Sequence, residues 1–204
     1  MSELFDALKF RVQGDLMFDR FSRGRYATDA SLYQMMPLGV LSPRSEDDIC
    51  AAIDIAGEQG LPLLARGGGT SQCGQTVNKA LVLDNTQYFN EIIELDVEGQ
   101  RCVVRPGIVL DDLNRVLKPH GLWFPVDVST ASRATIGGMT GNNSCGGKSL
   151  RYGMMRDNVL SIDAFLADGS KHHFGPIRPN ASPLLRSLTN DLLGLGAREA
   201  AEID

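Results

Sequence analysis

The sequence predicts an α+β fold built of α/β subdomains, and three observations support it. A strand, an amphipathic helix and a second strand follow one another between residues 37 and 66, which is typical of a parallel strand–helix–strand unit. Two later stretches, EIIELD and RCVVRPG, read as neighbouring strands separated by a turn. Glycines also cluster at 67–69, 137–138 and 146–147, which indicates backbone packed closely against something.

The first strand–helix–strand unit has clear boundaries. LGVLSPRS predicts a short strand ending at Pro43. Ser45 and Asp48 then predict a capping box, in which the hydroxyl accepts an early helix N–H and the carboxylate reaches back. The helix stops near Gly60, and LPLLA and ALVLD follow as buried strands. The spacing of these elements predicts parallel pairing.

The second half of the chain is less regular. An amphipathic helix is expected over residues 109–118. Residues 124–158 show little periodicity and are rich in Gly, Ser, Thr and Asn, and such a stretch inside a compact domain is usually functional. VLSIDAFLADGSKHHFG predicts a hairpin with Asp168-Gly169 as its turn. A last helix is expected over roughly 181–195.

These elements predict three segments. Residues 1–25 are expected to be an N-terminal helical extension, with a loose helical pattern over 3–22 that Gly14 interrupts. Residues 26–86 are the first predicted subdomain. Residues 87–204 are the second, which is expected to be incomplete.

Composition excludes several classes of protein. A formal net charge of −5 and the lack of a basic stripe argue against a nucleic-acid binder. The sequence has no long apolar run, so neither a signal peptide nor a transmembrane segment is expected. No C-x-x-C pair or His/Cys cluster suggests a metal site. Free thiols in a reducing cytoplasm are expected for the four cysteines, at positions 50, 73, 102 and 145.

The stretch PLLARGGGTSQCGQT, residues 62–76, resembles two phosphate-binding motifs and completes neither. The dinucleotide fingerprint needs glycine where Gln72 stands. The Walker A motif needs lysine where Gln75 stands, and glutamine cannot supply that charge. Consecutive glycines can still gather N–H groups around an anion, with hydroxyl donors from Thr70 and Ser71. A glycine-rich turn between strands is the alternative.

A second stretch, DVSTASRATIGGMTGNNSCGGKSLRYG, repeats this chemistry of glycines, hydroxyls and short amides. Each of the two glycine-rich regions follows a predicted strand–helix unit in the sequence. Clefts between subdomains are preferred sites for cofactors. The sequence therefore predicts one long ligand lying between two subdomains.

The order of these motifs resembles a known family. RGGGTSQCG, VVRPG, GLWFPVDVSTASRATIGG, NNSCGG, RYG and DNVL follow one another as in the FAD-binding PCMH-type domain of the vanillyl-alcohol oxidase/p-cresol methylhydroxylase superfamily. Within it, the chain looks most like the glycolate oxidase and D-lactate dehydrogenase branch. RFSRGRYATDASLYQMMP is similar to large FAD- and iron–sulfur-containing dehydrogenases of 2-hydroxy acids. The resemblance covers about residues 18 to 175 and implies a small parallel βαβ subdomain packed on a second, mixed-sheet subdomain.

The resemblance also implies which residues contact FAD. Covalent members of the superfamily carry histidine at the position of Thr70, so non-covalent FAD is expected. Lys148 and Arg151 are considered for contact with the flavin, with solvated surface charge as the alternative. The expected cofactor-binding residues are Arg66, Gly67, Gly68, Gly69, Thr70, Ser71, Gly74, Ser129, Thr130, Arg133, Thr135, Gly138, Asn142, Asn143, Ser144, Cys145, Gly146, Tyr152 and Asp157.

The activity implied is oxidation of a 2-hydroxy acid of the D-lactate, glycolate or 2-hydroxyglutarate type by hydride transfer to flavin. The electron acceptor, or an iron–sulfur domain or subunit, is expected outside this chain, as is the catalytic base, so no catalytic residue is assigned. His172 and His173 read as exposed strand residues. A cytoplasmic location is expected, with membrane association through a partner left open. The alternatives are another flavin oxidase of the superfamily and a non-catalytic nucleotide-binding or scaffold subunit.

Overall fold

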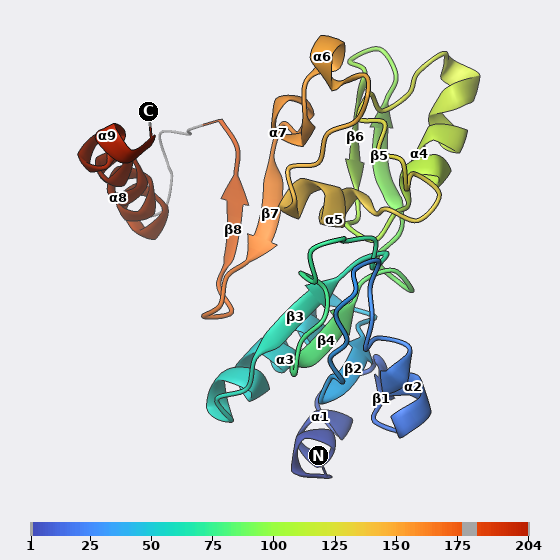
Figure 1. Cartoon of the computed structure of the whole chain (residues 1–204), viewed down its shortest axis with the longest axis vertical. Helices are drawn as coiled ribbons and strands as arrows, with labels where there is room; N and C mark the ends of the chain where they lie inside the picture. Colours follow the sequence, from blue (N-terminus) through green and yellow to red (C-terminus); the bar gives the residue numbers. More distant parts are fainter. Residues whose placement is uncertain (1, 177–182, 204) are drawn as a thin grey trace. The chain divides into compact units, whose positions relative to one another are not determined.

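The structure is a computed structural model, and it describes residues 2–176 and 183–203. The chain divides into two compact units (Figure 1). The larger unit is Met1–Val159 with Ala167–Gly169, and the smaller unit is Leu160–Leu166 with Ser170–Asp204. The larger unit contains two layers, each with its own apolar core.

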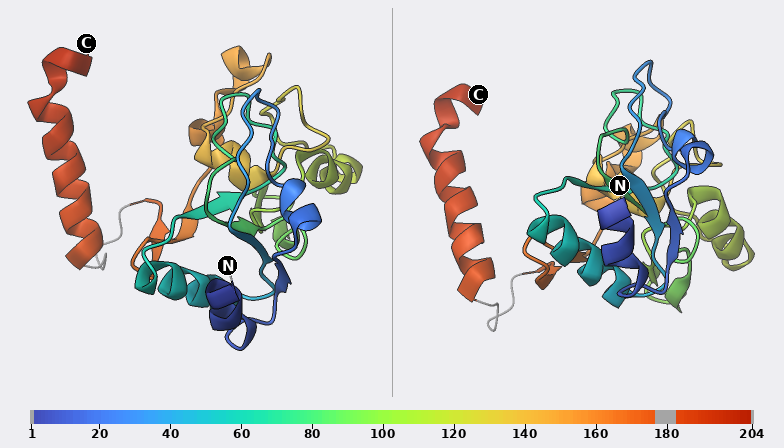
Figure 2. Two further views of the ribbon diagram at one scale, coloured as in Figure 1. Left: turned by 60° about the horizontal axis from the view of Figure 1, so that its bottom comes forward. Right: turned by 90° about the horizontal axis from the view of Figure 1, so that it is seen from below.

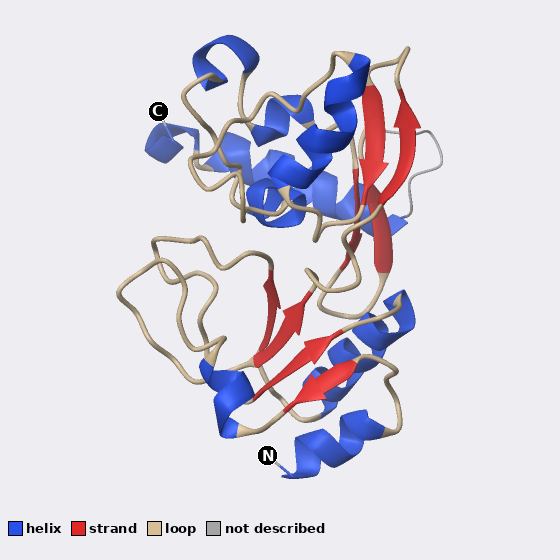
Figure 3. Ribbon diagram, turned by 90° about the vertical axis from the view of Figure 1, so that its right-hand side faces the viewer, coloured by secondary structure: helices blue, strands red, loops and turns tan. Residues whose placement is uncertain are grey.

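The first layer of the larger unit is a four-stranded sheet with helices. Its elements are α1 (Ser2–Lys9), β1 (Asp15–Met17), α2 (Arg20–Gly24), β2 (Gly39–Ser42), α3 (Glu46–Glu58), β3 (Leu63–Arg66) and β4 (Leu81–Asp84). The strand order is β1-β2-β4-β3. β2 and β3 both pair parallel with β4, as expected, while β1 pairs antiparallel with β2 (Figure 3).

Burial on both faces explains the apolar runs of the central strands. All four residues of β2 and of β4 are buried. Leu81 and Leu83 pack with α1 and α3 on one face, where Figure 2 shows both helices. Val40 and Val82 pack with Tyr26 on the other face. Because successive side chains alternate between faces, a strand covered on both sides has apolar residues at successive positions. The buried polar residues Ser42 and Asp84 stand only at the last positions of β2 and β4.

The capping box predicted at the start of α3 is confirmed. Ser45 Oγ accepts the N–H of Asp48, and the Asp48 carboxylate accepts the N–H of Ser45. The same carboxylate accepts the N–H of Gln13 at 2.7 Å and that of Arg44 at 2.8 Å. Asp48 is only 2% exposed. One buried carboxylate therefore fixes both the start of α3 and the segment that leads into β1.

The helical pattern expected over residues 3–22 is wrong in its middle. α1 and α2 are helices, but β1 lies between them and forms an edge of the sheet. A Cβ at Gly14 would overlap the carbonyl oxygen of Ser42, so glycine allows the chain to approach β2 at this point. α1 and β1 thus contribute to the core and the sheet of the first layer.

The second layer of the larger unit surrounds an antiparallel strand pair. Its elements are β5 (Ile92–Asp96), β6 (Arg101–Val104), α4 (Leu110–Leu117), the 3₁₀-helix η1 (Lys118–His120), α5 (Ile136–Gly141), α6 (Ser149–Tyr152) and α7 (Met155–Asn158). The pairing of β5 with β6 confirms the predicted neighbouring strands. α4 is the helix expected over 109–118, and its Leu110, Leu113 and Leu117 enter the core beside Val126.

The stretch 124–158, expected to lack regular structure, contains α5, α6 and α7. The longest of them, α5, has 6 residues. Elements this short do not produce a readable helical period. Their boundaries depend on caps and on contacts distant in sequence, such as the Asn143 Oδ1 that accepts the N–H of Arg156 at 3.0 Å.

The smaller unit contains both strands of the predicted hairpin and the C-terminal helices. Its elements are β7 (Ile162–Phe165), β8 (Lys171–Phe174), α8 (Pro183–Arg198) and α9 (Ala200–Ile203). β7 and β8 pair antiparallel, and Gly169 in the connecting turn has a φ of 79°. The start of the helix expected at 181–195 lies outside the described residues. Among the helices of the described residues, none is long and apolar enough to cross a bilayer.

The Asp48 network generates a stability prediction. We expect Asp48→Ala to lower the free energy of unfolding by about 2–3 kcal/mol, because it leaves buried N–H groups without an acceptor. Ser45→Ala, which removes only the helix cap, should cost about 1 kcal/mol. Urea unfolding followed by circular dichroism measures both. Asp47→Ala, an exposed position in the same first turn, is the control, and an Asp48→Ala loss no larger than this control would contradict the prediction.

Candidate functional site

The two glycine-rich regions meet in the structure. A Cβ added to Gly67 would overlap the Thr135 hydroxyl, and one added to Gly68 would overlap the carbonyl oxygen of Arg133. The backbone of the loop after β3 therefore packs on the Thr135 side chain and on the Arg133 backbone. Residues 65 or more positions apart in the sequence come this close because Gly67 and Gly68 have no side chains.

The loop that follows β3 begins where the parallel strands end. Ligands of α/β sheets bind at the carboxyl ends of the strands. Gly69 and Gly74 have φ angles of 65° and 74°, in the left-handed region that favours glycine. Side chains inside the loop bond to one another: the Ser71 hydroxyl donates to Gln75 Oε1 and accepts the N–H of Cys73 at 3.3 Å.

Arg66, the last residue of β3, does not direct its donors into open space. Its Nη1 donates to the carbonyl oxygens of Tyr26 at 3.0 Å and Thr76 at 2.9 Å. Its Nη2 donates to the carbonyl of Thr28 at 2.7 Å. The residue is only 9% exposed, and this burial lowers the pKa of the guanidinium. The side chain thus fastens the start of the loop to its end.

The segment before α5 is ordered by a tight turn and a cap. The N–H groups of Arg133 and Ala134 both donate to the Thr130 carbonyl at 2.8 Å. Thr135 is 2% exposed and caps α5 by accepting the N–H of Gly138 at 3.3 Å. Ser129 and Arg133 are exposed on this segment. The buried hydroxyl of Thr135 therefore has a structural role that its sequence position did not reveal.

The chain after α5 adds amide groups to the same place. Gln75 Nε2 donates to Asn142 Oδ1 at 3.2 Å, which links the loop to the end of α5 directly. Asn142 Nδ2 in turn donates to Ser144 Oγ at 3.2 Å. Gln75 was not among the expected site residues. The sequence feature that could have identified Gln75 is its position, where a Walker A motif has lysine.

Other expected site residues are held by different neighbours. Gly146 packs against Asp127, whose Oδ1 accepts the N–H of Lys148 at 2.9 Å. Asp157 accepts the N–H of Met154 at 2.8 Å. Tyr152 contacts Trp123 edge to face, with ring centroids 5.2 Å apart. Cys145 is exposed, and its thiol is free. These contacts do not connect Tyr152 or Asp157 with the loop after β3.

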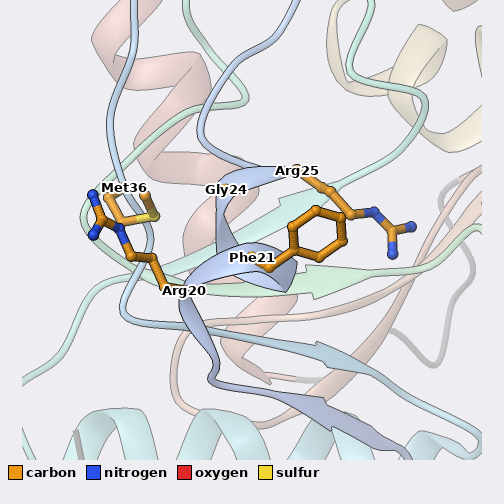
Figure 4. Close-up of a pocket in the computed structure, with 5 residues that line it drawn as sticks. All are labelled: Arg20, Phe21, Gly24, Arg25 and Met36. Carbon is orange, nitrogen blue, oxygen red and sulfur yellow. The ribbon is translucent and has the colours of Figure 1, made fainter.

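Two further features lie away from the meeting point of the glycine regions. A shallow hollow of about 610 Å³ is lined by residues of α2 and of the segment after it, namely Arg20, Phe21, Gly24, Arg25 and Met36 (Figure 4). His172 and His173, expected to be exposed, are half-buried on β8. His173 Nδ1 lies 2.8 Å from Asp163 Oδ1. Within the described residues, no group of three or more His, Cys, Asp or Glu side chains could hold a metal ion.

Comparison with known families matches this architecture. The profile of the FAD binding domain family matches residues 37–175. The chain belongs to this FAD binding domain family. The resemblance found in the sequence is therefore confirmed, and FAD is confirmed as the cofactor of the family.

Relatives with curated names are longer than this chain. It is 39% identical over 179 residues to the D-2-hydroxyglutarate dehydrogenase of Pseudomonas putida, covering 86% of this chain but 18% of that protein. It is 38% identical over 164 residues to glycolate oxidase subunit GlcD of Bacillus subtilis, covering 78% of this chain and 35% of that one. The BBE-like 1 protein of Physcomitrella patens has a TM-score of 0.75 at 18% identity, covering 86% of this chain and 38% of that chain. This last likeness confirms the fold.

The close backbone packing generates a prediction. We expect Gly68→Ala to lower the free energy of unfolding by about 1–3 kcal/mol, because a carbonyl oxygen cannot move aside as a flexible side chain can. Thermal or urea unfolding measures the change. Gly57→Ala is the control, since no described atom lies within 4 Å of a Cβ added there in α3. That variant should be neutral or up to about 1 kcal/mol more stable. Equal stability of the two variants would show that the glycine regions do not pack as described.

Proposed function

We propose that this chain holds FAD between its two glycine-rich regions, as the cofactor-binding part of a flavin-dependent oxidoreductase that oxidises a D-2-hydroxy acid. The observation that carries the proposal is Gly138. Its φ is not in the left-handed region. Among the described atoms, a Cβ there would meet only the Thr135 hydroxyl, at 3.1 Å. Backbone conformation does not require a glycine here, and the Thr135 hydroxyl requires it only in part. Because the same hydroxyl packs on Gly67, Gly138 lies where the two glycine-rich regions meet, and the close approach of a ligand there would account for it.

The residues around this point fit a dinucleotide. The loop after β3 would take the diphosphate through backbone N–H groups and the hydroxyl of Thr70, since consecutive glycines leave such groups accessible. The segment before α5 and the amides after it would contact the cofactor from the second layer. The proposed binding residues remain those expected from the sequence, with Arg66, Thr135 and Asp157 acting through the backbone they hold rather than through free donors.

The flavin is proposed to be held without a covalent bond. Members of the superfamily that bind flavin covalently carry histidine at the position of Thr70, by the sequence resemblance. A threonine hydroxyl can donate a hydrogen bond to a phosphate, but it does not form the histidyl linkage. Acid precipitation should therefore leave all the flavin in the supernatant.

The reaction class rests on the relatives. Proteins similar to this chain are named D-2-hydroxyglutarate dehydrogenase, glycolate oxidase subunit and D-lactate dehydrogenase, and all three names denote oxidation of a 2-hydroxy acid. When bound, FAD supplies the hydride-accepting ring. The residues of this chain bind and orient that cofactor. We propose that the base for the substrate hydroxyl and the electron acceptor, or an iron–sulfur domain or subunit, come from outside these residues, in a cytoplasmic protein.

Gly138→Ala separates the binding proposal from a purely structural role. The variant should fold with only a small loss of stability, because the Thr135 hydroxyl, at 3.1 Å, is the one tight neighbour of its Cβ. It should bind FAD at least about 10-fold more weakly, because the Cβ would occupy the path of the ligand. Quenching of flavin fluorescence measures affinity, and Gly57→Ala is the matched control. Wild-type protein that binds no FAD would favour the scaffold alternative. Normal FAD binding by Gly138→Ala would show that FAD does not bind beside Gly138.

Substrate class has its own test. In the natural polypeptide that contains these residues, anaerobic addition of D-2-hydroxyglutarate, D-lactate or glycolate should bleach the flavin absorbance near ~450 nm, because hydride transfer reduces the ring. L-2-hydroxyglutarate and L-lactate are the controls. Bleaching by neither D-acids nor glycolate would contradict the proposed reaction while leaving FAD binding intact.

A further inference from the structure

We propose that a segment N-terminal to the part of the chain that matches the family profile positions the cofactor loop. The matched part begins at residue 37, but several partners of the loop after β3 lie at residues 26–29. We define the N-terminal clamp as Tyr26, Asp29, Arg66 and Thr76. This inference rests on the proposed function, because it concerns the loop that would take the FAD diphosphate.

Arg66 is the centre of the clamp. One guanidinium joins three backbone carbonyls, those of Tyr26 and Thr28 in the N-terminal segment and that of Thr76 at the far end of the loop. The planar guanidinium offers several donors in a fixed geometry, which suits it to holding separate acceptors at once. A Cβ added to Gly69 would lie 2.6 Å from Arg66 Nη2. The loop is thus folded directly over the guanidinium.

Asp29 makes a second link between the same two segments. Its Oδ2 accepts the Thr76 hydroxyl at 3.0 Å and the Thr76 N–H at 3.4 Å, and its Oδ1 accepts the N–H of Ser31 at 2.8 Å. Partial burial acts to raise the pKa of this carboxyl, but the donors from Ser31 and Thr76 outweigh it, so the pKa is lowered. The ionised acceptor is therefore the form that the clamp stabilises.

Tyr26 anchors the N-terminal segment to the sheet. Its hydroxyl donates to Asp84 Oδ2 at 2.7 Å, at the end of β4, and both residues are buried. Burial, followed by this hydrogen bond, raises the pKa of the phenol. Asp84 pairs in register with Arg66 on β3. The side chain of Tyr26 is thus held by β4 while its carbonyl is held by Arg66, so the segment cannot shift without breaking both contacts.

The charges facing Arg66 make it a positioning residue and not a ligand of the diphosphate. Its hydrogen bonds all go to neutral carbonyls, and among the described residues it forms no ion pair within 4.0 Å. The carboxylates of Asp29 and Asp84 act on it only through space. These two negative charges offset its positive charge locally. Its effect on FAD is therefore through the shape of the loop.

Hydrogen exchange tests the clamp without any flavin. In the intact chain, Arg66→Gln and Asp29→Ala should each increase exchange at the amides of residues 67–76, because the loop is released at its end. Asp29→Asn, which keeps one acceptor oxygen for Thr76 but loses the charge and the second acceptor, should increase exchange less than Asp29→Ala. The matched controls are Arg23→Gln, which removes a donor to the Pro37 carbonyl, and Asp19→Ala, which removes the cap of α2. Unchanged exchange at 67–76 in folded Arg66→Gln and Asp29→Ala would overturn the proposal.

FAD affinity gives the second readout. Arg66→Gln and Asp29→Ala should each weaken FAD binding about 10-fold, and the double variant should lose clearly less than the product of the two, since both act on one structure. If the loss of FAD affinity in the double variant equals the product of the two single losses, the two residues act independently and the proposal of one clamp is overturned. Failure of wild-type protein to bind FAD would instead contradict the proposed function, and exchange at 67–76 would still decide whether the clamp exists. Normal affinity in both single variants, with normal binding by the wild type, would show that the loop needs no N-terminal support.

Discussion

The contact on which the rest of the larger unit depends is the backbone packing of Gly67 and Gly68 against Arg133 and Thr135. Two layers with separate cores meet there, with only the Thr135 side chain between Gly67 and the facing backbone. Close packing of this kind leaves no room for adjustment. The position of α5, the cap formed by Thr135 and the direction of the loop after β3 all follow from it. An ion pair between Arg105 and Glu46, with an N–O distance of 2.8 Å, adds a second connection between the layers.

The sequence predicted correctly those structural features that depend on only a few neighbouring residues. The Ser45–Asp48 capping box and the turn at Gly169 could be predicted because their chemistry is contained in three or four neighbouring positions. The apolar run of β4 predicted a buried strand, which is confirmed. The same prediction for β3 is wrong, because β3 lies at the edge of the sheet and is only partly buried. The two glycine-rich regions could also be recognised and assigned to one ligand, although their direct contact with each other was not predicted.

Features fixed by distant partners could not be predicted. The residues of β1 fall within a helical pattern in the sequence, so the strand was not predicted. The strand depends on a distant contact, the close approach of Gly14 to the carbonyl oxygen of Ser42. Arg66 was expected beside the cofactor because the family resemblance places it in the loop around the diphosphate. Nothing in the neighbouring sequence signals that its donors go to Tyr26, Thr28 and Thr76.

The link between Gln75 and Asn142 also has a kinetic consequence. Both residues are exposed, and one hydrogen bond of 3.2 Å joins them across the meeting point of the two layers. Exposed side chains change rotamer within picoseconds to nanoseconds, and a neutral hydrogen bond of this kind contributes only about 1 kcal/mol. A ligand that binds here, as proposed, would displace two amide side chains and leave the backbone packing in place. Access would then be governed by side-chain rotation, and the layers would not need to separate for the ligand to enter or leave.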